Sequence, residues 1–136
     1  MQQIHKWLVD VNVDDTKKAY AQGVEQCDCL ECMYFAEAAR TWPADVQAFF
    51  AQLGIDATQP SHLSVFSDGD ELLYIGSYHV IGTLVEGELC TLQSWNGSNT
   101  LQLQFLTLGF SQELSFVPAP FQKPVLQLNF EARIPR

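Results

Sequence analysis

The chain has 136 residues, of which 47% are hydrophobic, and it carries a net charge of −9. This apolar content excludes a disordered chain, and no apolar run approaches the roughly 18 residues of a transmembrane helix. At this length we expect one domain that spans residues 1–136. The chain does not begin with a basic segment followed by an apolar stretch, so we expect no signal peptide and a cytoplasmic location.

The charge is arranged unevenly along the chain. No Lys or Arg occurs between Arg40 and Lys123, while the 82 residues from Thr41 to Gln122 contain eight acids. Affinity for nucleic acids and for anionic membranes comes largely from Lys and Arg, so we exclude both as direct partners. The scattered acids favour solubility, with a basic protein partner as the alternative.

The first segment of the chain predicts a strand. Val9, Val11 and Val13 alternate with polar residues and therefore share one face. The polar residues that follow break this pattern. A short helix from Thr16 to Gln22 is expected before Gly23.

Two helices follow, and both have recognisable ends. Asp28 can cap the first, with Glu31 completing a capping box, and this helix is expected over Cys29–Thr41. Pro43 suits the start of the second helix, and Gly54 suits its left-handed end. An apolar stripe marks the second helix and consists of Val46, Phe49, Phe50 and Leu53.

From His62 onward the hydrophobic period is two, which is typical of strands. Turns are expected at Asp68-Gly69, at Glu86-Gly87 and over residues 96–99. Strands joined by tight turns are antiparallel. The fold class is therefore α+β, with an N-terminal helical pair packed on an antiparallel meander sheet of six to seven strands. The sequence does not decide whether this sheet is open, folded into a sandwich or barrel-like. The expected strands cover residues 62–66, 71–75 and 77–85 with a bulge at Gly76, 88–95, 101–105 and 125–131.

Three of the four cysteines lie close together in the sequence. Cys27, Cys29 and Cys32 form Cys-x-Cys-x-x-Cys at the expected helix start, where backbone N–H groups and the helix dipole stabilise thiolates. Closely spaced thiolates are a usual half of a structural zinc site, and zinc takes four N or S ligands. The candidates for the fourth ligand are Cys90, His5, His62 and His79.

Three other interpretations of the cysteines stay open. Cys29 and Cys32 have the spacing of a redox dithiol, although the usual preceding strand is missing. A single cysteine could be a nucleophile with a distant histidine. The thiols could also be reduced packing residues. No other cofactor motif is present, so zinc is the one cofactor candidate.

A second candidate site lies on the expected strand around His79. His79 shares a face with Ser77, a potential hydroxyl partner, but no acid is placed to orient the imidazole. Tyr74 and Tyr78, together with Trp95, could line a ligand pocket or an interface, or could pack as core aromatics. No complete catalytic constellation occurs, so whether the chain is an enzyme is left open.

Several short motifs resemble a group of small bacterial proteins. They are the Cys-x-x-Cys-x-x-Phe order of Cys29–Phe35, the helix that starts at Pro43 and ends in Leu53-Gly54-Ile55-Asp56, and the Tyr-x-x-x-Gly order of Tyr78–Gly82. The group has no assigned activity, so the resemblance implies a bacterial cytosolic protein and no particular function. Cys27 departs from the pattern.

The sequence therefore predicts a non-catalytic binding or interaction module, with an unknown protein or a small ligand as partner. The alternatives are a thiol-dependent protein that uses Cys27, Cys29 and Cys32, and a ligand-binding protein with a pocket near Tyr78, His79 and Trp95. A homodimer could form through the extended segments Leu101–Phe105 and Val125–Phe130, since sheet edges need to be covered.

Overall fold

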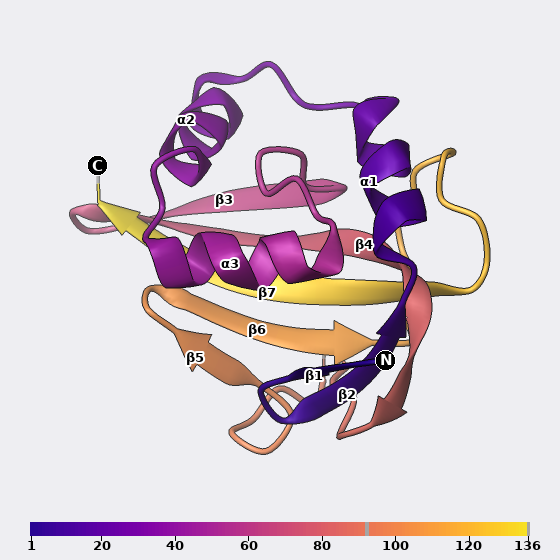
Figure 1. Ribbon diagram of the computed structural model, residues 1–136. Coiled ribbons are helices and arrows are strands. Elements are labelled where there is room, and N and C mark those ends of the chain that lie inside the picture. Colours follow the sequence, from indigo (N-terminus) through magenta and orange to yellow (C-terminus); the bar gives the residue numbers. More distant parts are fainter. Residues whose placement is uncertain (92, 136) are drawn as a thin grey trace.

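The structure, a computed structural model, describes residues 1–91 and 93–135. Within them it contains three helices and seven strands, which confirms the α+β class (Figure 1). In chain order they are β1 (Gln2–Ile4), β2 (Trp7–Val11), α1 (Val13–Ala21), α2 (Leu30–Ala39), α3 (Ala44–Leu53), β3 (His62–Asp68), β4 (Glu71–Glu86), β5 (Leu101–Leu103), β6 (Leu106–Ser111) and β7 (Val125–Pro135). No helix among these residues is long and apolar enough to cross a membrane.

The strands form one antiparallel sheet in the order β1-β2-β4-β7-β6-β5, with β3 paired to the first half of β4. The order is not strictly sequential, because β7 returns from the end of the chain to lie between β4 and β6. The sheet is open, because its strand order ends at β1 on one side and at β5 on the other. From Gln127 to Phe130 both edges of β7 are therefore paired, so this part of the segment has no free edge for a second copy.

The helix starts differ from the predicted ones because of local hydrogen bonds. Asn12 caps α1 by accepting from the backbone N–H of Asp15 at 3.0 Å, so Val13 begins a helix and does not extend the strand. Cys29, and not Asp28, caps α2 through its sulfur. Gly54 ends α3 at a φ of 76°, as predicted.

Three strand predictions were wrong in detail. Gly76 lies in regular pairing without a bulge, and its Cβ would stand 2.3 Å from the carbonyl oxygen of His62. The segment 88–95 has no strand in its described part and forms a loop. Gln104 takes a φ of 57°, so the expected strand 101–105 stops at Leu103 and turns into β6.

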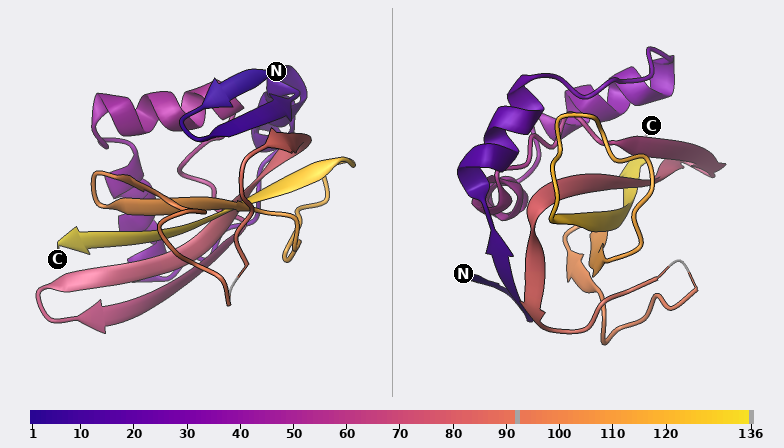
Figure 2. Two further views of the ribbon diagram at one scale, coloured as in Figure 1. Left: turned by 90° about the horizontal axis from the view of Figure 1, so that it is seen from below. Right: turned by 90° about the vertical axis from the view of Figure 1, so that its right-hand side faces the viewer.

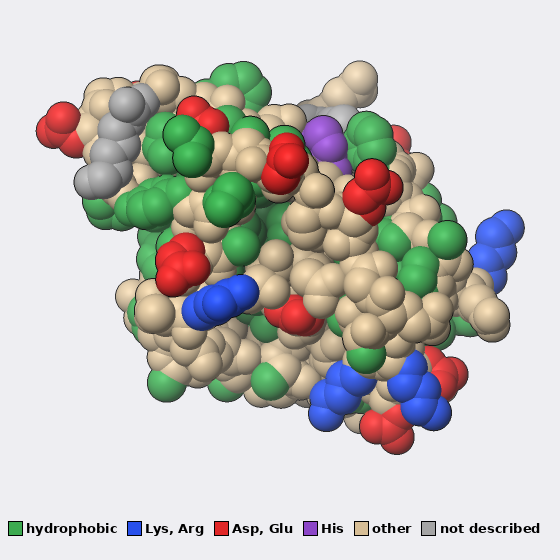
Figure 3. Space-filling model, turned by 90° about the horizontal axis from the view of Figure 1, so that it is seen from above, with side chains coloured by type: hydrophobic (Ala, Val, Ile, Leu, Met, Phe, Trp, Pro, Cys, Tyr) green, Lys and Arg blue, Asp and Glu red, His purple; other side chains and the backbone are tan. Residues whose placement is uncertain are grey.

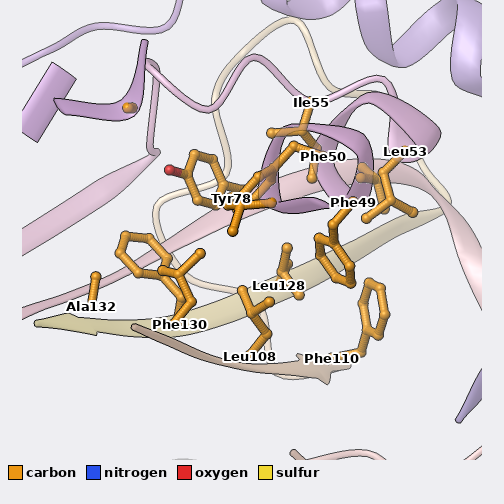
Figure 4. Packing of buried hydrophobic residues seen from close by; sticks show 14 of the residues in the cluster. Phe49, Phe50, Leu53, Ile55, Tyr78, Leu108, Phe110, Leu128, Phe130 and Ala132 are labelled. Atoms are coloured by element: carbon orange, nitrogen blue, oxygen red, sulfur yellow. The ribbon is translucent and has the colours of Figure 1, made fainter. Parts of the chain in front are cut away.

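The core lies between the helices and one face of the sheet. Apolar side chains of α3 point at the strands and meet alternate residues of β4, β6 and β7 (Figure 4). The inward face of β7 is the predicted one, formed by Leu126, Leu128 and Phe130. α2 joins this core through Phe35, whose ring centroid lies 5.0 Å from that of Tyr74 and 5.6 Å from that of Phe130.

The opposite face of the sheet is covered by loops. The connections over residues 87–91, 93–100 and 112–124 extend from the sheet on the side away from α3 (Figure 2). Gln127 and Asn129, which were expected to point outward, do point to this face. Gln127 is nevertheless only 5% exposed. The loops therefore bury a polar side chain on the face of the sheet opposite the apolar core.

Candidate functional site

Cys27, Cys29 and Cys32 come together at the start of α2. Their three sulfur atoms lie within 4.8 Å of one another. The Cys29 backbone N–H donates to the Cys27 sulfur at 3.4 Å, and the Cys32 N–H donates to the Cys29 sulfur at 3.4 Å. Cys27 is exposed and the other two are half-buried, so the cluster opens to solvent.

The cluster favours a thiolate at Cys29. Hydrogen bonding from the Cys32 thiol, and then from the Cys32 backbone N–H and from Cys27, lowers the pKa of Cys29. Partial burial, followed by the hydrogen bonds and charges of the neighbouring thiols, raises the pKa of Cys32 to about 12. Cys29 therefore ionises more readily than Cys32, which keeps its proton to a higher pH.

The surroundings of the cluster are acidic and apolar. Asp28 and Glu31 lie between its cysteines in the sequence, and the Glu31 carboxylate opposes the lowering of the Cys29 pKa. Leu30 and Met33 on α2 are 81% and 58% exposed. Hydrophobic side chains gather over α2 on this face of the molecule, with acidic side chains and one Lys or Arg side chain near them (Figure 3).

The predicted fourth ligands lie elsewhere. Cys90 is buried on the loop-covered face, where its backbone N–H donates to the Phe110 carbonyl. His5 occupies the turn between β1 and β2 and lies against Phe49. His62 stacks on a phenylalanine of the 112–124 loop, with ring centroids 4.4 Å apart. Within the described residues, the group of side chains whose geometry could hold a metal ion comprises the three clustered cysteines.

The aromatic residues proposed for a ligand pocket do not share one cavity. Tyr74 and Tyr78 are fully buried on the helix-covered face, where they donate hydrogen bonds to the carbonyl oxygens of Glu31 and Ala57. Trp95 lines a groove of about 360 Å³ on the opposite face. Successive strand residues point to opposite faces, so the sheet separates Tyr78 from His79.

His79 is fully buried, and its partners differ from the one the sequence suggested. Its Nδ1 lies 2.6 Å from the Ser61 hydroxyl, and its Nε2 lies 3.0 Å from Oε1 of Gln127. Burial lowers the pKa of His79, although the Gln127 hydrogen bond opposes this. Sequence analysis missed Ser61 and Gln127, because strand pairing brings them to His79 from 18 and 48 residues away.

Comparisons of the chain with family models, with curated proteins and with solved structures find no match. The resemblance indicated by the short motifs therefore stays a prediction.

Proposed function

We propose that the protein is a binding module that holds one thiophilic metal ion, zinc in the first instance, through Cys27, Cys29 and Cys32. The observation that carries this proposal is the grouping of the three sulfur atoms within 4.8 Å. A tetrahedral zinc site with Zn–S bonds of about 2.3 Å places its sulfurs about 3.8 Å apart. Small side-chain rotations can bring the three sulfurs to that spacing.

The electrostatics of the cluster favour a cation over chemistry by free thiolates. Asp28 and Glu31 disfavour the accumulation of thiolate charge, and both attract a metal ion. Two backbone N–H groups already point at the sulfurs, as they do at bound thiolates in metal sites. Thiolates select zinc and monovalent copper over magnesium and calcium. A divalent ion bound to the three sulfurs would displace the protons that remain on the cysteine thiols.

The site leaves one position of a tetrahedral ion to an external ligand. The three cysteines supply three ligands, and the described residues add no fourth to the group. Structural zinc sites are usually closed, whereas open ones bind water or an incoming group. This arrangement favours a module whose ion is completed by water or by a side chain of a partner.

Titration with Co²⁺, a spectroscopic substitute for zinc, tests the proposal. We expect one equivalent to produce sulfur-to-cobalt charge-transfer absorption and the visible bands of a tetrahedral ion, and one equivalent of Zn²⁺ to abolish them. Cys90→Ala is the matched control, because this fourth cysteine lies outside the cluster. Absence of thiolate bands, or equal loss of them in Cys90→Ala, would contradict the proposal.

A redox dithiol is the second candidate for the same residues. The lowered pKa of Cys29 beside the raised pKa of Cys32 is the asymmetry of an attacking and a resolving thiol. Incubation of the metal-free protein with glutathione buffers and trapping of the free thiols separates the two functions. A Cys29–Cys32 disulfide populated at cytosolic glutathione potentials would favour redox use over metal binding.

An interaction role is favoured by the apolar strip on α2. Leu30, Met33 and Tyr34 are 81%, 58% and 41% exposed on a helix that also buries Phe35. Sedimentation at increasing concentration, with and without zinc, measures self-association through this strip. Met33→Glu should weaken any association that is seen. A strict monomer that Met33→Glu leaves unchanged would contradict this role.

A further inference from the structure

The hydrogen bonds around His79 fix its tautomer. Oε1 of Gln127 accepts from the backbone N–H of Ser115 at 2.8 Å, so this oxygen cannot be exchanged with the amide nitrogen. The Gln127 nitrogen in turn donates to Oδ1 of Asn129 at 2.7 Å. His79 must therefore donate from Nε2 to the Gln127 oxygen. The Nδ1 lone pair is left free, and the Ser61 hydroxyl donates to it at 2.6 Å.

This relay has the order of a nucleophile, a base and an orienting group. A serine hydroxyl bonded to a neutral imidazole, whose other nitrogen is held by a fixed acceptor, is the arrangement of serine hydrolases. Here the orienting group is the amide oxygen of Gln127 rather than a carboxylate. The serine faces Nδ1 of the imidazole, whereas in serine hydrolases it faces Nε2. The base is fully buried and the serine is half-buried, so a solute approaches the relay from the Ser61 side.

Ser61 opens into a groove that could seat a substrate. The groove has a volume of about 450 Å³ and lies between the segment before α2 and the 112–124 loop. Val24, Phe116, Val117 and Pro118 supply an apolar wall, and Glu25 is the acid that lines it. These walls fit an apolar acyl group and disfavour an anionic one.

We propose that Ser61 is an activated nucleophile that accepts acyl groups from uncharged or cationic esters. The Ser61 Oγ bonds to the acyl carbon while its proton moves to Nδ1 of His79. The ester C–O bond then breaks, and the alcohol leaves with that proton. Water then attacks the acyl-serine while its proton moves to Nδ1 of His79. The bond between the acyl carbon and the Ser61 Oγ breaks, His79 returns the proton to that oxygen, and the carboxylic acid leaves. The relay itself contains no cysteine, although Cys27 lines the same groove.

An alkyl fluorophosphonate tests the nucleophile directly, since it reacts only with activated serines. The Ser61 oxygen would bond to phosphorus, fluoride would leave, and intact-mass and peptide analysis would locate the label. We expect one label per chain at Ser61, none in Ser61→Ala, and none in heat-unfolded protein. Ser64→Ala is the matched control, because Ser64 lies 3.1 Å from the His62 imidazole without this buried relay.

Gln127 is a positioning residue, and two variants separate that role from a structural one. Gln127→Leu should slow labelling at least about tenfold, and Gln127→Glu, which keeps an oxygen toward His79, should restore it to within about threefold. Thermal melts identify variants that fail to fold. Absence of label on folded wild-type protein, or labelling that survives Ser61→Ala, would overturn the proposal.

Discussion

The backbone N–H of Cys32 donates to the sulfur of Cys29 across 3.4 Å, so the atom that caps α2 is also a proposed metal ligand. Helix N-caps are usually oxygen atoms of Ser, Thr, Asp or Asn. Sulfur is a weaker acceptor and a better ligand for zinc. A metal bound there would hold the start of α2 in place through the group that begins the helix.

Substitution of Cys29 by serine separates capping from metal binding. We expect Cys29→Ser to leave the free energy of unfolding of the metal-free protein within about 1 kcal/mol of wild type, because serine is a good N-cap. Zinc affinity should fall by more than about 100-fold, since loss of a ligand exceeds the usual effect of an outer hydrogen-bond partner. Urea unfolding and competition with a zinc chelator measure the two quantities. A large loss of stability with unchanged affinity would reverse this assignment.

The thiols of the metal-free protein should react with iodoacetamide in a fixed order. The lowered pKa of Cys29 makes it react at a lower pH than Cys32, whose pKa is about 12. Mass mapping after short pulses between pH 6 and 10 gives the order. Faster alkylation of Cys32 than of Cys29 would show that the thiolate resides on the other sulfur.

The buried His79 should make the protein less stable in mild acid. Burial lowers the pKa of His79 below its ordinary value of 6.5, so the unfolded chain binds the proton more readily. The contribution of His79 to stability is therefore fully present above pH 6.5 and is lost as pH falls through the folded-state pKa. Chemical shifts of the imidazole in NMR spectra give this pKa directly. A His79 pKa above 6.5 would contradict the neutral imidazole on which the Ser61 relay depends.

Gly82 and Gly97 give a matched test of the close strand packing. A Cβ on Gly82 would stand 2.3 Å from the Asp10 carbonyl oxygen, whereas one on Gly97 would meet nothing within 4 Å. We expect Gly82→Ala to cost about 1–3 kcal/mol of folding free energy and Gly97→Ala to change it by less than about 0.5 kcal/mol. Thermal and urea unfolding measure both variants. Equal stabilities would mean that β2 and β4 separate at no cost.

Sequence patterns predicted those parts of the fold that local physics determines. The stripe on α3 and its end at Gly54 follow from helical periodicity and a left-handed cap, and both were confirmed. The alternation at Leu126, Leu128 and Phe130 likewise gave the buried face of β7. Sequence patterns could not predict the position of β7 between β4 and β6, because it depends on contacts between segments far apart in the chain.

The candidate sites divide in the same way. The three clustered cysteines were predictable, because they lie within six residues and a helix start brings them together. Ser61 and Gln127 were not, since only the pairing of β3 and β7 with β4 brings them to His79. Alternation along β4 already placed Tyr78 and His79 on opposite faces, and the pocket hypothesis that joined them was wrong for that reason.

X-ray absorption at the zinc edge, on protein loaded with one equivalent of Zn²⁺, tests the central claim most directly. The three-cysteine site predicts three sulfur neighbours at about 2.3 Å and one nitrogen or oxygen neighbour at about 2.0–2.1 Å. Cys90→Ala should give the same spectrum. A shell of nitrogen and oxygen alone would contradict binding by Cys27, Cys29 and Cys32, and four sulfur neighbours would contradict the open position.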